Sequence, residues 1–202
     1  GELKFASQFG YNIALGETKA DKKSLTTFRD RYLSALRKIS NDSPFVTDKM
    51  PHNFRFVGLI HATFPDAKII HVKRDAAATC WSSFKHYFTT KGLGYSNNLD
   101  DLVKYYGLYE SLMSFWNEQL PGRIYNVNYD ELTINQEEET RRLIQKLGLD
   151  WEDACLSPES NKRTVKTASL LQVRQKVYVD SSQQWRIFEK FLDGKFDNLN
   201  PV

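Results

Sequence analysis

Three residues that could bind an anionic ligand stand at or near the ends of β-prone runs. They are Lys49 in the run 44–51, Arg74 directly after the run 67–73, and Tyr129 at the end of the run 123–129. Ligands of open α/β sheets bind at the carboxyl ends of the strands. Two cations and an aromatic hydroxyl at that edge favour a phosphorylated aromatic ligand, such as a nucleotide.

The segment after Arg74 is expected to carry further polar side chains toward such a ligand. Residues 75–88 predict a helix, and Asp75 is a residue type that caps helix N-termini. The free N–H groups of that helix would add an anion site. Ser82 comes eight residues after Arg74, about two helical turns along, and His86 lies one turn further.

A basic stretch near the C-terminus supplies more positive charge. From Asn161 to Val179 there are cations but no Asp or Glu; the cations are Lys162, Arg163, Lys166, Arg174 and Lys176. Placed over the strand ends, such a loop could close on an anionic ligand, with Arg174 as a candidate contact.

Each of these residues also has a plain structural interpretation. A cation at a strand end is commonly a solvated charge, and a basic run is commonly a soluble face. Ser82 then becomes a helix-surface hydroxyl, and Tyr129 a core residue whose hydroxyl is bonded locally. The residues expected to pack inside are His61, His71, Trp116 and Trp151. From the residues alone, the interpretation stops at an α/β protein that binds a nucleotide or phosphate.

The elements that must position these residues alternate along the chain. Helices are expected at 25–39, 53–64, 75–88, about 98–119, 135–147 and 181–192, between and around the three β-prone runs. Gly148 is the expected C-cap of the helix 135–147. Strands alternating with helices favour an α/β fold with an open parallel sheet flanked by helices.

Composition excludes several other classes of protein. The 202 residues are 41% hydrophobic and 26% charged, which is globular, and the net charge of +3 is too small for wholesale binding of nucleic acid. No apolar run approaches the roughly 18–20 residues of a membrane span, and the start has no signal-peptide pattern. Cys80 and Cys155 lack metal-ligand spacing. We expect a cytoplasmic single domain over 1–202 with no metal, and leave a homo-oligomer open.

Longer motifs resemble the sulfotransferase superfamily. They run in order through most of the chain: TDKMPHNF (47–54), FPDAKIIHVKRD (64–75), YYGLYESLMSFW (105–116), LPGRIYNVNYDEL (120–132), RRLIQKLGLDWEDACL (141–156) and TASLLQVRQKVYVDSSQQWR (167–186). The similarity is greatest to the bacterial tetratricopeptide-associated branch and to tyrosylprotein sulfotransferases.

This resemblance implies a P-loop-related fold that uses 3′-phosphoadenosine 5′-phosphosulfate as donor and a hydroxyl as acceptor, without a metal. Arg74 and Ser82 match the family's pair that holds the donor's 3′-phosphate, and a guanidinium fork suits a phosphate. His86 stands where tyrosylprotein enzymes have a further basic residue. Tyr129 matches the tyrosine on the adenine side.

The resemblance also assigns the transfer step. Lys49 matches a lysine that stabilises the transferring group or its bridging oxygen. Glu2 is the candidate catalytic base, with Glu17 in reserve, because a glutamate of this neighbourhood has that role in tyrosylprotein enzymes. Sulfuryl transfer should resemble phosphoryl transfer, in which positioning and charge stabilisation dominate.

Two departures from the family pattern keep alternatives open. The family's R-D-P-x-D reads Arg-Asp-Ala-Ala-Ala at 74–78, and Gly1-Glu2-Leu3 stands where relatives have already passed a strand and the loop around the 5′-phosphosulfate. We therefore expect a truncated sheet that lacks the usual first strand and P-loop. One alternative is an inactive fragment or interaction domain. Another, a P-loop phosphotransferase, lacks its G-x-x-x-x-G-K-S/T motif here.

Overall fold

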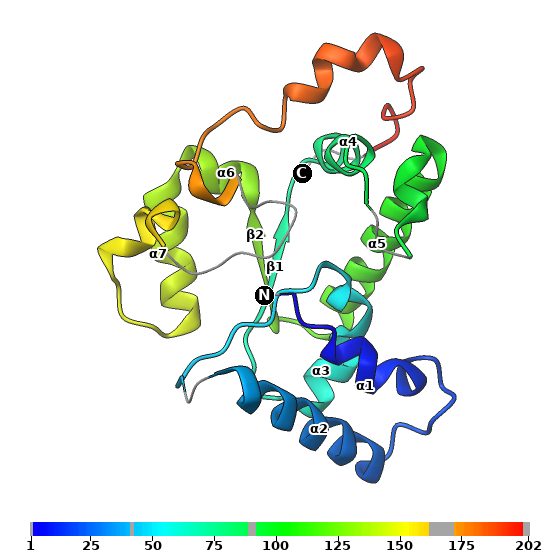
Figure 1. Ribbon diagram of the computed structural model, residues 1–202, viewed down its shortest axis with the longest axis vertical. Helices are drawn as coiled ribbons and strands as arrows, with labels where there is room; N and C mark the ends of the chain where they lie inside the picture. The colour runs from blue at the N-terminus through cyan, green and yellow to red at the C-terminus, as the bar shows by residue number, and fades with distance from the viewer. Residues whose placement is uncertain (1, 41–42, 89–91, 162–171, 200–202) are drawn as a thin grey trace. The chain divides into compact units, whose positions relative to one another are not determined.

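The chain folds into two compact units of different character. The computed structural model describes residues 2–40, 43–88, 92–161 and 172–199 (Figure 1). Of the described residues, those within 2–67 form the helical unit, and those within 68–161 and 172–199 form the sheet unit. The single domain expected over 1–202 stays a prediction, because two compact units can belong to one domain.

The helical unit is built on an aromatic core. Its elements are α1 (Phe5–Ala14), α2 (Lys22–Ser40), the 3₁₀ helix η1 (Pro51–Phe56) and α3 (Val57–Thr63). Phe28 is only 1% exposed, and its ring meets that of Tyr32 edge-on with centroids 5.7 Å apart. Arg29 ties α2 to the end of α3, because its Nη1 donates to the Thr63 carbonyl at 2.9 Å.

Gly10 lets α1 approach this core closely. A Cβ at this position would lie 2.4 Å from Leu59 Cδ2 and 2.9 Å from Phe28 Cε2. Both neighbours belong to the packed aromatic cluster, so they have little room to give. The α1 helix has an apolar residue at every fourth position, Phe5, Phe9 and Ile13, which is a helical signal that sequence analysis passed over.

The β-prone run 44–51 is not a strand, so the first of the three expected strands is wrong. Its residues have no regular structure before η1 begins at Pro51. A strand needs a neighbouring strand for its N–H and C=O groups, and the described residues give this run none. Phe45, at 71% exposure, packs little, which agrees with an unpaired segment.

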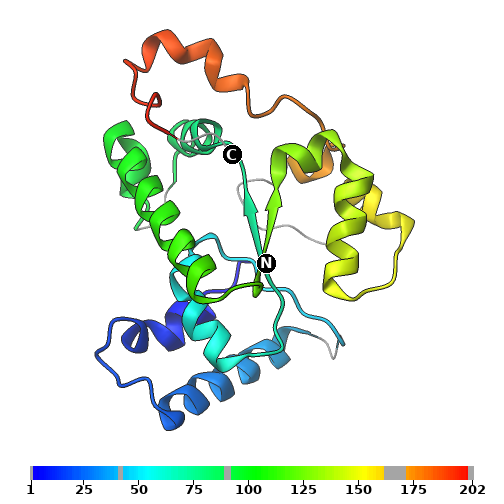
Figure 2. The ribbon, with the colours of Figure 1, turned by 180° about the vertical axis from the view of Figure 1, so that it is seen from behind.

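The sheet unit contains two parallel strands, and it confirms the α/β fold with a parallel sheet. Strand β1 (Ile69–Lys73) pairs with β2 (Ile124–Asn128) from Ile69 opposite Ile124 to Lys73 opposite Asn128. Figures 1 and 2 show the two arrows side by side with the same direction. Parallel strands require a crossover connection, which here contains the helices α4 (Ala76–Phe84) and α5 (Leu99–Gln119). Arg74 and Tyr129 consequently leave the same end of the sheet.

The crossover between the strands forms the core of the sheet unit. It consists of α4 (Ala76–Phe84), the 3₁₀ helix η2 (Gly94–Asn97) and α5 (Leu99–Gln119). The small residues of α4, including Ala77 and Cys80, are buried against Leu102 and Tyr106 of α5. Burial raises the pKa of the Cys80 thiol to about 12, with the charges of Glu110 and Asp75 adding to the effect. Cys80 is therefore a packing residue.

The rest of the sheet unit consists of shorter helices. After β2 come α6 (Tyr129–Ile134), α7 (Gln136–Leu147) and the 3₁₀ helices η3 (Asp153–Leu156), η4 (Pro158–Ser160), η5 (Gln172–Arg174) and η6 (Gln184–Phe191). The expected C-cap is confirmed, because Gly148 ends α7 with a φ of 73°. The expected final helix 181–192 is a shorter 3₁₀ helix instead, η6, which packs against α4 through Phe188 and Trp81.

Several other helix boundaries and burial assignments differ from expectation. The expected helix 53–64 is divided into η1 and α3, and 75–88 is helical only to Phe84. Trp116 and Trp151 were expected in the core, but both are half-buried. Trp151 instead lies under the Arg141 guanidinium, 3.9 Å from the ring centroid. Among the helices described, none has the length and apolar character needed to cross a membrane.

Candidate functional site

Arg74 directly follows β1, at the sheet edge where ligands of open α/β proteins bind. Its guanidinium is held by a segment more than a hundred residues away in sequence. Nε donates to Ser182 Oγ at 2.8 Å, while Nη2 donates to the Ser181 carbonyl at 2.7 Å and to the Ser181 hydroxyl at 3.2 Å. Among the described residues, Nη1 has no such partner, so one corner of the fork remains for a ligand.

Two carboxylates near Arg74 in the chain or through Ser182, those of Asp75 and Asp130, are hydrogen-bonded within the protein. Asp130 accepts the Ser182 hydroxyl proton on Oδ1 and the backbone N–H of Asp75 on Oδ2, the latter at 2.9 Å. Asp75 in turn caps α4, since its side chain accepts from the Ala78 N–H at 2.7 Å. The expected cap is thus confirmed, but it uses one of the N–H groups that the expected anion site needed.

Tyr129 and Arg74 are brought together as the sequence predicted. Tyr129 begins α6 directly after β2, and the Arg74 Cζ lies 5.5 Å from the centre of its ring. A cation at this distance from an aromatic face is stabilised by the ring quadrupole. An aromatic ring beside a guanidinium offers a stacking surface next to an anion site, which is the combination expected for a nucleotide.

Ser82 and His86 lie further along the same connection. Ser82 is half-buried in the second turn of α4. It follows Asp75 by seven residues, so the two share a face of the helix. His86 lies beyond the C-cap of α4, and its ring contacts Phe88 with centroids 5.7 Å apart. The roles of both residues at a 3′-phosphate stay predictions.

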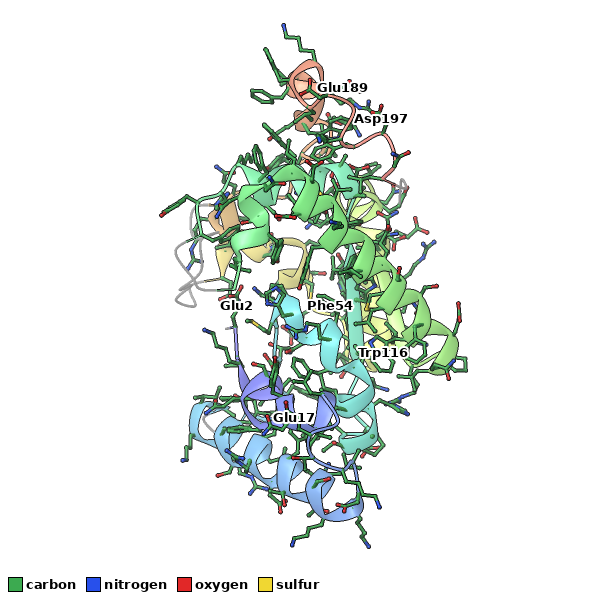
Figure 3. All side chains as sticks on the ribbon, turned by 90° about the vertical axis from the view of Figure 1, so that its right-hand side faces the viewer. Glu2, Glu17, Phe54, Trp116, Glu189 and Asp197 are labelled. Carbon is green, nitrogen blue, oxygen red and sulfur yellow. The ribbon has the colours of Figure 1, made fainter. Side chains whose placement is uncertain are left out.

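The structure pairs the two residues assigned to the transfer step, Glu2 and Lys49, within the helical unit. The Lys49 ammonium forms an ion pair with Glu2 Oε1, although the Lys49 side chain is 65% exposed. The neighbouring Asp48 anchors this segment by accepting the hydroxyl proton of Tyr32, and burial together with that carboxylate raises the pKa of Tyr32 above its usual range. Glu2 precedes α1 and the reserve Glu17 follows it (Figure 3).

The predicted contact from the C-terminal basic stretch is described only in part. Arg174 ends η5 with an exposed side chain, in the sheet unit. Lys162, Arg163 and Lys166 lie outside the described residues. Whether the stretch closes on an anion therefore stays a prediction.

A groove of about 780 Å³ lies in the sheet unit, lined by residues of both strands and of α5. A chain of hydrogen bonds runs along it. Asn117 Nδ2 donates to the Met113 carbonyl, Asn126 Nδ2 donates to Asn117 Oδ1, and Asn126 Oδ1 lies 2.8 Å from His71 Nδ1. These directions make His71 Nδ1 the donor, so its Nε2 accepts the hydroxyl proton of Tyr109.

Burial lowers the pKa of His71; the hydrogen bond to Asn126 opposes this effect, and the charge of Lys73 adds a smaller lowering. His71 of β1 thus connects β2 and α5 in surroundings that disfavour its protonated form. The expectation that His71 packs inside is corrected to a half-buried residue in a polar chain. No predicted site residue lines this groove, so it is a separate feature of the unit.

Sequence reasoning missed the partners of Arg74. Ser181 and Ser182 lie in a motif that carries the family resemblance, but no role was assigned to them, because a separation of 108 residues gives no spacing signal. No role was predicted for Asp130, although it directly follows Tyr129. Within the described ranges, no group of three or more His, Cys, Asp or Glu is arranged to hold a metal ion.

Comparisons with known proteins agree with the motifs. The sulfotransferase family model matches residues 11–153. An uncharacterized protein of Aquifex aeolicus is 37% identical over 174 residues, which is 85% of this chain and 23% of that protein. A protein-tyrosine sulfotransferase of Drosophila melanogaster is 25% identical over 127 residues, and protein-tyrosine sulfotransferase 1 of Danio rerio is 26% identical over the same length.

Those 127 residues are 63% of this chain, 26% of the Drosophila protein and 36% of the Danio protein. The chain therefore spans between about a quarter and about a third of the curated relatives it matches. The family match itself covers well over half of the chain and includes Lys49, Arg74, Ser82 and Tyr129. This chain belongs to the sulfotransferase family.

Proposed function

We propose that the protein transfers a sulfuryl group from 3′-phosphoadenosine 5′-phosphosulfate to an acceptor hydroxyl, with Arg74 binding the donor's 3′-phosphate. The observation that carries this proposal is the placement of Arg74. It stands at the carboxyl end of β1, beside the Tyr129 ring, with Nη1 directed to no described partner. Arginine forms short, strong hydrogen bonds to phosphate.

The described residues fit the donor at this end of the sheet. A guanidinium supplies charge for the 3′-phosphate, and Tyr129 supplies an aromatic face for the base. Ser82 adds a hydroxyl on the face of α4 that begins at Asp75. His86 would add a positive charge in its protonated form.

The transfer step is proposed for Glu2 and Lys49, whose ion pair couples their two roles. When Lys49 turns to neutralise the charge that develops on the bridging oxygen, the Glu2 carboxylate is released. It can then accept the proton of the attacking hydroxyl, a contribution of about 10²–10⁴ in rate for general bases. The sulfur–oxygen bond to the donor breaks as the bond to the acceptor oxygen forms, and the nucleotide product keeps its 3′-phosphate.

Calorimetric titration of the 202-residue chain with adenosine 3′,5′-bisphosphate tests the donor site, with AMP and ATP·Mg as comparison ligands. We expect the bisphosphate to bind more tightly than AMP, because only the bisphosphate carries the 3′-phosphate. Equal affinity for the two would refute the donor assignment. Tighter binding of ATP·Mg than of the bisphosphate would favour a phosphotransferase instead.

The variant Arg74→Ala tests the residue that carries the proposal. A hydrogen bond to a charged group is worth about 1.5–3 kcal/mol, so bisphosphate affinity should fall about ten- to a hundredfold while AMP binding changes little. Arg142→Ala is the matched control: it removes the same charge from the exposed face of α7 in the same unit. A bisphosphate affinity equal to that of the control would overturn the role of Arg74.

A further inference from the structure

The protein holds one edge of the Arg74 guanidinium and leaves another corner for a ligand. Ser182 accepts from Nε, and Ser181 accepts from Nη2 through both its carbonyl and its hydroxyl. The guanidinium is planar and presents its N–H groups in a fixed fork. Fixing the edge from Nε to Nη2 therefore determines where Nη1 points.

The direction of the Ser182 hydroxyl is itself determined. A serine hydroxyl has a single proton, and Ser182 donates it to Asp130 Oδ1. The oxygen therefore turns a lone pair toward Arg74 Nε and can only accept there. Ser182 is 5% exposed, so water competes little for either bond.

Asp130 is in turn anchored to both strand ends. Its Oδ2 accepts the backbone N–H of Asp75, just after β1, and its own N–H donates to the side chain of Asn128 at the end of β2. Among the described residues, Asp130 makes no direct bond to Arg74 and reaches it only through Ser182. The chain of bonds from Asp130 through Ser182 to Nε thus has one direction only.

We propose that Ser182 is a positioning residue for Arg74. Ser182 is itself oriented by Asp130, and it holds the guanidinium so that Nη1 points to the 3′-phosphate of the donor. This inference rests on the proposed function. The alternative is that the serine oxygens occupy the place of phosphate oxygens and compete with the donor. The bond from Ser182 to Asp130 argues against competition, because it makes the serine part of the buried framework.

Three variants of the 202-residue chain test the inference by the affinity ratio of adenosine 3′,5′-bisphosphate to AMP. Ser182→Ala should lower the bisphosphate affinity about tenfold and leave AMP binding unchanged, whereas Ser182→Thr, which keeps a hydroxyl, should restore the ratio. Ser181→Ala is the matched control, because the Ser181 carbonyl still accepts from Nη2. A ratio in Ser182→Ala equal to that of the control, or higher than in the parent chain, would overturn the inference.

A second readout does not depend on nucleotide binding. In chain labelled with ¹⁵N-arginine, the Arg74 Nε–H signal, assigned by its loss in Arg74→Lys, should exchange slowly with water. Ser182→Ala should make that exchange fast, and Ser182→Thr should keep it slow. If the parent chain shows no preference for the bisphosphate, the proposed function fails, and this signal alone decides the inference. Unchanged slow exchange in Ser182→Ala would then refute the positioning role.

Discussion

At the scale of single residues, polar side chains in the sheet unit act as directional connections between distant segments. Ser182 connects Arg74 to Asp130, and His71 connects α5 to the sheet through Tyr109 and Asn126. In both cases a group with few protons can satisfy its neighbours in only one way. Protonation or truncation of such a group should therefore have effects that its exposure alone does not indicate.

The imidazole of His71 makes stability depend on pH. Because burial lowers its pKa in the folded chain, the unfolded chain binds the proton first as pH falls through about 6.5. The unfolded state then holds more protons, so the free energy of unfolding should fall with decreasing pH. Urea unfolding at pH 7.5, 6.5 and 5.5 should show this loss, and His71→Gln should reduce it.

His86→Gln is the matched control, because His86 is outside the hydrogen-bond chain. His52 in the helical unit, whose pKa is also lowered by burial, contributes in the same direction and should remain visible in the His71 variant. If the free energy of unfolding of His71→Gln depended on pH as strongly as that of the parent chain, the effect would not come from His71.

At the scale of elements, caps and backbone conformation determine where the helices end. Gly148 ends α7 in the left-handed conformation, and Gly107 lies within α5 with open space around the position of a Cβ. A side chain at Gly148 would have to accept a positive φ, whereas a side chain at Gly107 would sit in ordinary helical backbone with open space around it. Glu137 and Glu138 form ion pairs with Arg141 and Arg142, one helical turn further along.

Substitution by alanine should change the free energy of unfolding in opposite directions at these two glycines. Gly148→Ala should lower the free energy of unfolding by about 1 kcal/mol, because a Cβ is disfavoured at positive φ. Gly107→Ala should raise it by about 0.5–1 kcal/mol, because alanine restricts the unfolded chain and fits an exposed helix. Denaturant unfolding of the two variants measures both effects. A Gly148→Ala variant at least as stable as the parent chain would contradict the assigned C-terminal end of α7.

At the scale of the whole molecule, the two units have separate cores. The aromatic cluster around Phe28 lies within the helical unit, and the cluster around Cys80, Leu102 and Tyr106 lies within the sheet unit. The two clusters share no residue. Each unit therefore has its own apolar contacts to lose when a core residue is truncated.

Truncation of Phe28 should act mainly within its own unit. Phe28→Ala should cost about 3–5 kcal/mol of local stability, because it removes a ring that is 1% exposed. Amide hydrogen exchange should accelerate in α1, α2 and α3 and stay near its original rate in β1 and α5. Leu102→Ala is the matched experiment and should give the reverse pattern. Equal acceleration throughout in both variants would show that the units unfold together.

The sequence by itself determined the local features that depend on neighbours in the chain. Apolar periodicity and capping chemistry account for two strands, two caps and three helices. These are the strands 69–73 and 124–128, the caps Asp75 and Gly148, and the helices α2, α5 and α7. The positions of Arg74 and Tyr129 at the ends of two β-prone runs also predicted that they share one sheet edge, because parallel strands bring their carboxyl ends together.

Only the tertiary structure decided the features that depend on distant partners. The run 44–51 has strand propensity but no strand beside it, so its hydrogen-bonding groups find no ladder. The bonds from Arg74 to Ser181 and Ser182 join residues more than a hundred positions apart, and the pairing of Glu2 with Lys49 joins residues 47 apart. No spacing rule reaches over such distances, because side-chain partners are chosen by packing and hydrogen-bond geometry.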